Sequence, residues 1–400
     1  MSSMHIGILT GGGDVPGLNA AIKSVYLAAK ERGWLRKGST DARVTGILRG
    51  WKGAVHMGGD PAGEDERSST LPLTDEIVRT VDRYGGTFLH TSRIRPDRMR
   101  LEELPAGLRK RRSDLKAVGG RDDLFDMTDR VVDNLRRAGI DCLIAIGGDD
   151  TLGYAHTLNA RGFPVIGIPK TMDNDVRGTE YAIGFKTAMT RADQFINRQR
   201  THLGSHETVG VFRIFGRNAG FTALGTSMAI SDIRCAIPEH PFDLDALCRL
   251  VREDYVRNLH HYALVVCSEG AMWKGGRLEE YGPPDAYGHR KKANVGEALA
   301  AEIARRTGLP TRMQDLTYDL RSGAPDGIDK IVANTFGALA VELLAGGHTG
   351  RMVCMQAGVY GHTDLPDPAR GARTIDVAAH YDADKFRPKF TGLMGKPLFF

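Results

Sequence analysis

Two short acidic clusters, Gly147–Thr151 and Pro169–Asp175, combine residue types that can do chemistry. They supply carboxylates, a lysine, and glycines that let a ligand approach the backbone. Each cluster follows an apolar run that predicts a buried parallel strand, and open α/β sheets bind ligands beyond the carboxyl ends of such strands. Because Mg²⁺ prefers carboxylate and phosphate oxygens, the two clusters predict phosphoryl transfer assisted by a divalent metal.

One aspartate in each cluster has a candidate role. Asp149 is the candidate magnesium ligand, and Asp173 is the candidate base for the proton of an attacking sugar hydroxyl. Thr171 offers a hydroxyl to the same substrate. The structural alternatives are a helix cap at Asp149 or Asp150 and a tight turn built by the Asp-Asn-Asp run. Because both clusters occur in one chain, we favour the catalytic interpretation.

A third candidate is the glycine-rich loop Thr10–Asn19, which follows the first predicted strand. Gly12 and Gly13 expose successive backbone N–H groups, and the positive end of the next helix adds to them. This pattern predicts a phosphate cradle, although a simple tight turn is the alternative. The loop contains neither the GK[ST] of a Walker loop nor GxGxxG.

Together these three segments resemble the 6-phosphofructokinase family. The resemblance runs in family order from about residue 5 to residue 355 and includes Gly86–Leu89 with Arg93, Phe215–Arg217, Glu269, Thr311-Arg312 and Tyr318–Gly323. It implies an α/β phosphofructokinase fold: two interleaved Rossmann-like domains with mostly parallel sheets. We expect a donor- and magnesium-binding domain over residues 1–184 plus about 323–375. A fructose 6-phosphate-binding domain is expected over 185–322 plus the C-terminal tail.

The resemblance also implies roles for individual residues. Asp173 would accept the proton of the fructose 6-phosphate 1-hydroxyl, Asp149 would hold Mg²⁺, and the catalytic set is Asp173, Asp150, Lys170 and Arg217. Donor binding is expected from Gly12, Gly13, Arg93, Asp150, Thr151 and Lys170. Substrate binding is expected from Thr171, Met172, Asp173, Phe215, Gly216, Arg217, Glu269, Arg312, Tyr318 and Arg321. Guanidinium groups bind phosphate bidentately, although a structural salt bridge is the alternative for any single arginine.

Some positions depart from the family pattern. Phe215 replaces the usual methionine, and Thr208 stands where many members place an arginine that crosses to a neighbouring subunit. Arg200 and Arg213 are the candidate substitutes for that arginine. Tyr318 occupies a position where many ATP-using members carry histidine, and tyrosine there resembles pyrophosphate-using relatives.

Asp150 and Lys170 indicate the phosphoryl donor. ATP-using bacterial members usually carry glycine at both positions. A carboxylate at position 150 would meet the α-phosphate of ATP, and like charges ~4 Å apart repel by about 4 kcal/mol at an effective dielectric of ~20, roughly a thousandfold in binding. Pyrophosphate is shorter, and Lys170 can neutralise the departing phosphate. The pair resembles the pyrophosphate-dependent branch, which reversibly converts fructose 6-phosphate and pyrophosphate into fructose 1,6-bisphosphate and phosphate in glycolysis and gluconeogenesis.

Three other functions compete with this one. The first is an ATP-dependent 6-phosphofructokinase, and the second is a non-catalytic regulatory subunit on the same fold. Intact Asp149, Asp173 and Arg217 disfavour the regulatory subunit. The third is nucleic-acid binding through the basic stretch 109–121, which lacks an accompanying aromatic stacking motif and is therefore disfavoured.

Composition sets the broad class of the protein. The chain has 400 residues, 41% of them hydrophobic and 26% charged, with a net charge of +5. That size predicts two domains of a soluble protein, and no apolar run is long enough to span a membrane. The N-terminus lacks the pattern of a signal peptide, and the five cysteines lack CxxC spacing. We therefore expect a cytoplasmic enzyme with reduced thiols, assembled as a homodimer or homotetramer.

Alternating strand and helix patterns must position these motifs. Strands are predicted at 5–10, 43–48, 141–146, 164–168, 207–213, 262–268, 311–316 and 351–355. Helices are predicted at 18–32, 128–137, 181–200, 244–258, 296–306 and 328–344. This alternation predicts parallel sheets wrapped by helices. Residues 57–74 and 270–293 are expected to be surface loops.

Overall fold

A computed structural model describes residues 3–58, 69–110, 115, 117–118, 121–276, 280–281, 291–292 and 294–397. Much of the two expected surface loops, at 59–68, 277–279, 282–290 and 293, lies outside the described residues. The loop prediction at 57–74 is wrong at its end, because Thr70–Pro72 pairs with Val44–Ile47 as an edge strand and Leu73 is buried. So do Arg111, Arg112 and Lys116 of the basic stretch. Within the described part, no helix is long and apolar enough to cross a membrane.

The first sheet has seven strands in the order β16-β15-β8-β7-β1-β2-β3. Its strands are β1 (Ile6–Thr10), β2 (Val44–Ile47), β3 (Thr70–Pro72), β7 (Cys142–Gly147), β8 (Val165–Pro169), β15 (Arg351–Gln356) and β16 (Val359–Asp364). The inner strands pair in parallel, and only the two edge strands are antiparallel. The prediction of a mostly parallel sheet is therefore confirmed.

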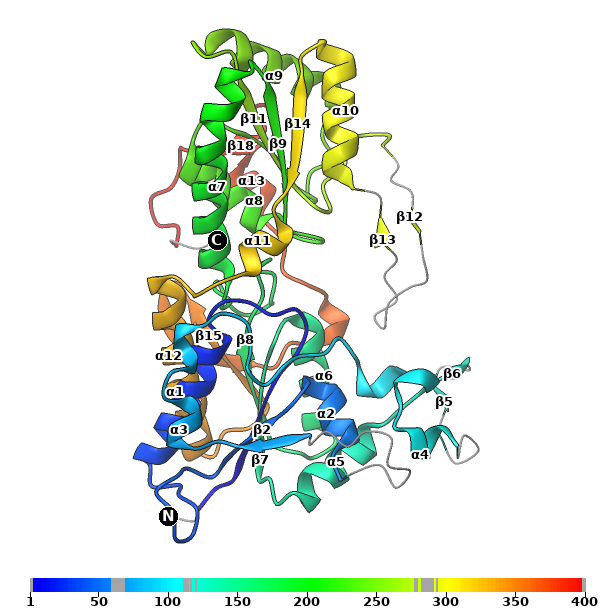
Figure 1. The fold of residues 1–400 in the computed structure, drawn as a ribbon, viewed down its shortest axis with the longest axis vertical. Helices are drawn as coiled ribbons and strands as arrows, with labels where there is room; N and C mark the ends of the chain where they lie inside the picture. The colour runs from blue at the N-terminus through cyan, green and yellow to red at the C-terminus, as the bar shows by residue number, and fades with distance from the viewer. Residues whose placement is uncertain are drawn as a thin grey trace.

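Helices cover both faces of this sheet (Figure 1). They are α1 (Leu18–Glu31), α2 (Gly50–His56), α5 (Thr128–Arg137), α6 (Asp149–Ala160) and α12 (Gly327–Ala345). Side chains alternate between the faces of a strand, so Ile6 and Ile8 join the core under α1 and α12, whereas Leu9 joins the core under α2, α5 and α6. Buried apolar side chains on both faces explain the continuous apolar runs in the sequence.

The second sheet has four parallel strands in the order β10-β11-β9-β14. These are β9 (Val209–Ile214), β10 (Arg234–Ala236), β11 (Ala263–Ser268) and β14 (Thr311–Asp315). The helices of this half are α7 (Phe185–Ser205), α8 (Phe221–Ile230), α9 (Leu244–Arg257), α10 (Val295–Thr307) and α11 (Thr317–Arg321). After α11 the chain returns through α12 to the first sheet, where β15 pairs with β8. The proposed domain limits stay a prediction.

Short elements complete the described chain. They are α3 (Asp75–Val78), η1 (Val81–Arg83), η2 (Pro96–Arg98), β4 (Met99–Arg100), η3 (Leu101–Glu103), α4 (Ala106–Arg109), β5 (Ala117–Val118), β6 (Arg121–Phe125), β12 (Glu280–Tyr281), β13 (Lys291–Lys292), η5 (Pro368–Arg370), α13 (Val377–His380), β17 (Tyr381–Asp382) and β18 (Arg387–Pro388). Strands β4, β5 and β6 form a small separate sheet.

The predicted strands agree with the structure to within two residues at each end. The predicted helix at 181–200 is wrong at both ends, because α7 begins only at Phe185 and continues to Ser205. Ile183 instead forms an isolated bridge with Lys170, and Gly184 adopts a left-handed conformation with φ 102° just before the helix. The apolar residues of this segment therefore hold the Lys170 loop in place. All five cysteines are buried free thiols, as expected.

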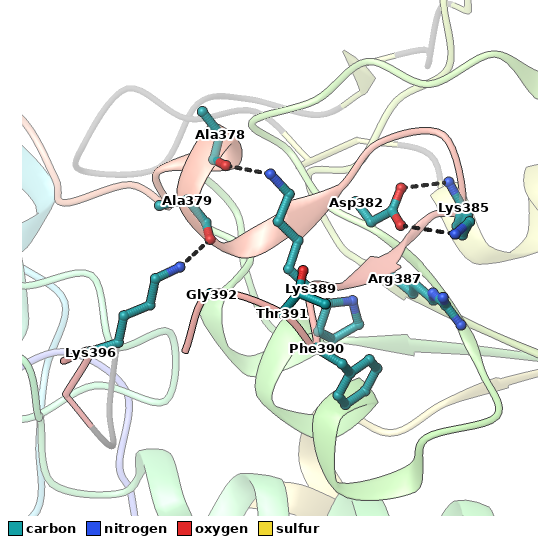
Figure 2. Close-up of a pocket in the computed structure, with 11 residues that line it drawn as sticks. Ala378, Ala379, Asp382, Lys385, Arg387, Lys389, Phe390, Thr391, Gly392 and Lys396 are labelled. Carbon is teal, nitrogen blue, oxygen red and sulfur yellow. Dashed lines mark hydrogen bonds and ion pairs between the residues drawn. The ribbon is translucent and has the colours of Figure 1, made fainter. Parts of the chain in front are cut away.

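The C-terminal tail packs against the second sheet. Tyr381 donates a hydrogen bond to the carbonyl of Cys235 on β10, and the backbone N–H of Cys235 donates to Phe386. The tail also forms a basic cavity of about 520 Å³ in which Lys389 and Lys396 donate to backbone carbonyls of α13 (Figure 2). This cavity contains none of the residues that the sequence predicts for chemistry.

The buried carboxylate of Asp329 joins α12 to the segment that leads into α7. It accepts hydrogen bonds from the Tyr181 hydroxyl at 2.6 Å, from the Gly184 N–H at 2.8 Å and from the Thr187 N–H at 2.7 Å. The Thr187 hydroxyl also donates to it. Burial raises the pKa of Asp329, but these donors satisfy the carboxylate.

We expect Asp329→Ala to lower the free energy of unfolding by about 3 kcal/mol, because buried donors lose their common acceptor. Urea denaturation monitored by circular dichroism measures this loss. Asp384→Ala, at an exposed position, is the matched control and is expected to change it by less than about 0.5 kcal/mol. Equal effects of the two substitutions would contradict the role of Asp329.

Candidate active site

The three predicted loops meet at the carboxyl ends of β1, β7 and β8. The N–H of Gly11 donates to the carbonyl of Ile146 at 2.9 Å, which places the glycine-rich loop beside the end of β7. The N–H of Lys170 donates to the carbonyl of Gly147, also at 2.9 Å. Parallel neighbouring strands therefore bring together segments that are far apart in the sequence.

Two glycines of these loops are required by the packing of Thr151. A Cβ at Gly11 would lie 2.5 Å from the Thr151 hydroxyl oxygen, and one at Gly147 would lie 2.3 Å from the Thr151 Cβ. Thr151 itself is only 2% exposed. The structure thus places this predicted donor-binding residue beneath the loops, where its side chain sets their spacing.

Asp149 and Asp150 occupy the first turn of α6. The residue that precedes the helix as its N-cap is Gly148, so neither aspartate occupies the capping position that was the structural alternative. Burial raises the pKa of Asp149, and the charge of Asp150 raises it further, while Arg177 and Arg95 lower it. The positive end of the helix favours both negative charges.

Lys170 is a buried cation at the glycine-rich loop. Its Nζ donates a hydrogen bond to the carbonyl of Gly13 at 2.7 Å, and the side chain is 3% exposed. A Cβ on Gly12 would approach Nζ to 3.3 Å. Burial, together with the charges of Arg321 and Arg93, lowers the pKa of Lys170 to about 7. A bound anion would relieve this concentration of positive charge.

Arg321 brings a second cation to the same loop from α11. Its Nη1 donates to the carbonyl of Asp14 at 2.8 Å, and its guanidinium lies 4.3 Å from the centre of the Phe215 ring. A Cβ on Gly13 would lie 2.6 Å from Nη1, so the close approach requires glycine. Loops of both sheets therefore contact each other at this site.

Asp173 lies partly buried where these loops meet. Burial raises the pKa of Asp173 to about 6, and the negative charge of Glu269 acts in the same direction. The backbone N–H of Arg217 donates to the Asp173 carboxylate at 3.3 Å. The backbone N–H of Asp173 donates to the Thr171 hydroxyl at 3.2 Å. A carboxylate with this pKa is a stronger base than an exposed aspartate and is still ionised at pH 7.

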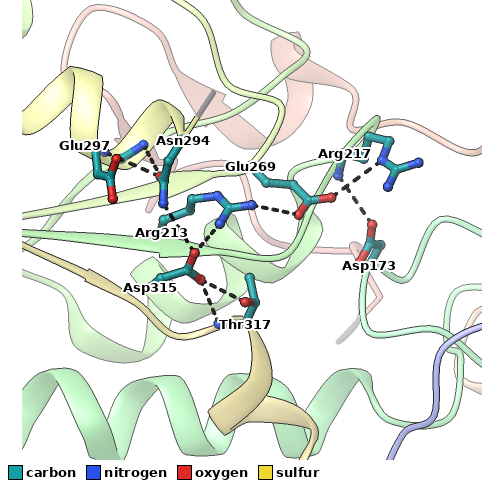
Figure 3. Close-up of polar contacts among 9 residues, drawn as sticks. Asp173, Arg213, Arg217, Glu269, Asn294, Glu297, Asp315 and Thr317 are labelled. Atoms are coloured by element: carbon teal, nitrogen blue, oxygen red, sulfur yellow. Dashed lines mark hydrogen bonds and ion pairs between the residues drawn. The ribbon is translucent and has the colours of Figure 1, made fainter. Parts of the chain in front are cut away.

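Arg217 and Glu269 follow the ends of β9 and β11 and face Asp173 (Figure 3). The Arg217 Nε lies 3.7 Å from the Glu269 Oε1, and the Arg217 side chain is half exposed. Gly216 between Phe215 and Arg217 has φ 122°, and a Cβ there would lie 2.5 Å from the carbonyl of Ala219. This glycine therefore turns the chain so that the Arg217 N–H points at Asp173.

Other predicted residues lie differently. The Met172 side chain is buried in the core, and only its backbone carbonyl makes a polar contact, with Thr222 at 2.6 Å. Arg93 is exposed, although its charge acts on Lys170 and Arg321. Tyr318 is 83% exposed.

Arg312 is separated from the rest of the predicted substrate set. It is exposed on β14 opposite Gly210, near the start of β9, whereas Glu269 pairs with Ile214 at its end. Four residues along a strand correspond to ~13 Å. Of the two candidate substitutes for the arginine absent at position 208, Arg200 donates to Tyr262, whereas Arg213 contacts Glu269.

Two contributions to the site were not apparent from the sequence. The backbone carbonyl of Asp14 accepts from Arg321, and no side-chain pattern can reveal such a role. Arg373, from the tail, donates through its side chain to the Asn174 carbonyl and through its backbone N–H to the Asp175 carbonyl. An isolated arginine in a tail carries no recognisable sequence signal.

The residues present fit a magnesium ion that is completed by its substrate. Within the described ranges, no group of three or more His, Cys, Asp or Glu residues could hold a metal alone. Mg²⁺ in phosphoryl-transfer enzymes is commonly bound by one or two carboxylates together with phosphate oxygens and water. Asp149 meets that requirement, because its partly buried carboxylate lies in an acidic environment that a cation would offset.

Comparisons with known proteins agree with this geometry. The family model described as Phosphofructokinase matches residues 5–344. ATP-dependent 6-phosphofructokinase 3 of Streptomyces coelicolor is 32% identical over 383 residues, which is 95% of this chain and 99% of the relative. Pyrophosphate–fructose 6-phosphate 1-phosphotransferase of Amycolatopsis methanolica is 34% identical over 385 residues, which is 96% of this chain and 99% of the relative.

A solved structure titled as a pyrophosphate-dependent phosphofructokinase from Nitrosospira multiformis has a TM-score of 0.74 at 18% identity, covering 97% of this chain and 89% of that one. The fold and the family match together define a phosphotransferase built on two parallel sheets. The chain belongs to the phosphofructokinase family. Both the family and the fold inferred from the sequence are confirmed. Relatives named for ATP and for pyrophosphate occur at similar identity, so family membership leaves the donor open.

We expect Lys170→Met to stabilise the protein in the absence of anions, because it removes a buried charge. The folded-state pKa is lowered to about 7, so the cost of burial is fully present below pH 7 and falls as pH rises above it. The gain in free energy of unfolding should therefore be about 1 kcal/mol or more at pH 6 and smaller at pH 9. Urea denaturation at both pH values measures it.

Lys385→Met, at a side chain that is 58% exposed, is the matched control and should change stability little at either pH. Addition of pyrophosphate should stabilise the wild type more than Lys170→Met. A destabilised Lys170→Met at pH 6 would contradict this interpretation of the site.

Proposed function

We propose that the protein is a pyrophosphate-dependent 6-phosphofructokinase that transfers a phosphoryl group reversibly between pyrophosphate and the 1-hydroxyl of fructose 6-phosphate. The observation that carries the choice of donor is the placement of Asp150 and Lys170. Asp150 adds an exposed carboxylate to the first turn of α6, while Lys170 buries a cation against the glycine-rich loop. Together they favour a short, highly charged donor over a nucleotide.

Asp173 is the base in the proposed mechanism. Its carboxylate, ionised above pH 6, accepts the proton of the attacking 1-hydroxyl as the bond to phosphorus forms. The Arg217 N–H holds the carboxylate in place from the second sheet. Because Asp173 and Arg217 come from different sheets, the base is correctly placed only when the two halves of the molecule are packed together.

Cations and backbone N–H groups hold the phosphates in this proposal. Gly12, Gly13 and Lys170 bind pyrophosphate, and the exposed Arg93 lies near enough to add its charge. Arg217 and Arg321 bind phosphate oxygens or sugar hydroxyls, and Glu269 accepts hydrogen bonds from the sugar. Asp149 would hold Mg²⁺, which neutralises charge on phosphate oxygens when it is bound.

The position of Arg312 supports the proposal that the enzyme is a homodimer or homotetramer. Within one chain, this exposed arginine lies ~13 Å along the sheet from the level of Glu269. Its expected contact with fructose 6-phosphate would therefore come from a neighbouring copy. Fructose 6-phosphate and pyrophosphate are the proposed ligands, and neither nucleic acid nor a membrane is a proposed partner.

ATP dependence is the second candidate function, and relatives named for ATP favour it. We expect initial rates with pyrophosphate to exceed those with ATP, with fructose 6-phosphate and Mg²⁺ present in both assays. Asp150→Gly should raise kcat/KM for ATP by at least about tenfold, because it removes a charge that repels the α-phosphate. Asp150→Asn, which removes the charge and keeps the size, separates repulsion from steric exclusion. No gain with ATP in either variant would contradict the charge argument.

Asp173→Ala is expected to lower kcat by roughly 10²–10⁴-fold, the usual contribution of a general base. In the wild type, kcat/KM should fall as pH drops through about 6, because protonation of Asp173 removes the base. Asp384→Ala should retain both the rate and the pH profile. An inactive wild type would instead indicate the regulatory-subunit alternative.

A further inference from the structure

We infer that Arg213 is a positioning residue that fixes Glu269 and the start of α11 relative to each other, and thereby sets affinity for the sugar phosphate. This inference rests on the proposed function. Arg213 lies on β9, the strand between β11 and β14 in the second sheet. The sequence made it a candidate substitute for the arginine absent at position 208, but in the structure its guanidinium pairs with Glu269 and Asp315 of the two neighbouring segments.

The strand register explains how one arginine reaches two acidic residues. Asp315 on β14 lies directly opposite Arg213, and Cys267 on β11 lies opposite it on the other side. Glu269 follows the last residue of β11, and its N–H donates to the carbonyl of Ile214 on β9 at 3.0 Å, which keeps it next to Arg213. The Arg213 Nη2 lies 3.3 Å from the Glu269 Oε2, and Nη1 pairs with Asp315 (Figure 3).

Asp315 connects Arg213 to α11. Its Oδ1 accepts from the Thr317 N–H at 3.1 Å and from the Thr317 hydroxyl at 2.8 Å, at the first residue of the helix. The backbone carbonyl of Arg213 also accepts from the Leu316 N–H at 3.0 Å. Arg321, the proposed phosphate-binding cation, is the last residue of α11. The Arg213 side chain is therefore linked both to Glu269 and to the helix that carries Arg321.

The energetics favour positioning over stability as the purpose of this arrangement. The Arg213 side chain is 20% exposed, and ion pairs withdrawn from water repay their desolvation only in part. Within the described residues its Nε is buried without a hydrogen-bond partner, which adds a further cost. A bridge that contributes little stability but fixes Glu269 and α11 relative to each other acts through geometry.

The bridge also acts on the charge at Asp173. The groups that face Asp173 are Glu269, which raises its pKa, and Arg217 and Arg321, which lower it. The charges of Lys170 and Asp175 also couple to it. Arg213 offsets the charge of Glu269 through their ion pair. Without Arg213, Asp173 should keep its proton to a higher pH, which is an effect that a purely structural arginine would not have.

The test compares Arg213→Met with Arg213→Lys and with a matched control, Arg234→Met. Arg234 lies on β10 of the same sheet and makes two contacts of 2.6 Å with Asp254, so its removal also breaks a strand-borne ion pair. The readouts are KM and kcat/KM against pH for fructose 6-phosphate, and calorimetric affinity for fructose 6-phosphate without donor.

Arg213→Met should raise KM and the dissociation constant for fructose 6-phosphate by about tenfold, the effect of one lost charge-assisted contact. The acid limb of kcat/KM should move up by about 0.5 pH unit or more. Arg213→Lys should restore the acid limb but only part of the affinity, because lysine keeps the charge and loses the two-point geometry. Arg234→Met should change neither.

The inference is overturned if a folded Arg213→Met variant keeps the wild-type KM, affinity and pH dependence of kcat/KM. It is also overturned if Arg234→Met shifts these three quantities as much as Arg213→Met does. If Arg213→Met does not fold, Arg213→Lys and Asp315→Asn decide the matter: raised KM in both supports the bridge, and wild-type values in both overturn it. A wild type that is inactive with both donors would overturn the proposed function instead. In that case the calorimetric affinity of the variants for fructose 6-phosphate still tests the role of Arg213. A wild type that does not bind fructose 6-phosphate overturns the inference about Arg213 as well.

Discussion

Burial of opposite charges in one small region is the constraint on which the rest of the site depends. Lys170 is buried and Asp173 is partly buried, and each is driven toward its neutral form, with a pKa of about 7 for Lys170 and about 6 for Asp173. Neighbouring groups only partly compensate, because arginines oppose the lysine and Glu269 opposes the aspartate. An anionic phosphate would offset the positive charge of Lys170 and its neighbouring arginines, whereas Arg217 and Arg321 offset the charge of Asp173.

Backbone geometry makes this burial possible. Gly11 and Gly147 leave room for Thr151 under the loops, and Gly216 turns the chain so that an N–H faces Asp173. Any side chain at these positions would push the loops apart and admit water to the charged groups. Gly11 and Gly147 therefore set the spacing of the loops at the end of the first sheet, and Gly13 leaves room for Arg321 from α11. A side chain also fixes geometry at the site, because the Arg213 guanidinium lies between the carboxylates of Glu269 and Asp315 and pairs with both.

Much of this protein could be predicted from its sequence because its signals are local. Buried parallel strands need continuous apolar runs, and the strand predictions agree with the structure to within two residues. The helix predicted from 181 fails at its start because its apolar residues serve a bridge to Lys170, a contact that local periodicity cannot distinguish from a helical face. A sequence motif also does not give the distance between residues. The motif of Arg312 indicated substrate binding, whereas the strand register places Arg312 far from Glu269 within one chain.

The sequence by itself determined the chemical groups, the order of the strands along the chain and the family. Residue type, apolar periodicity and motif spacing depend only on residues that are close together in the sequence. Only the tertiary structure decided which of those groups meet. Asp173 contacts Arg217 across 44 residues of the chain, and Arg321 contacts Asp14 across 307. It also decided their protonation, because a pKa depends on burial and on neighbouring charges, and both are properties of the packed molecule.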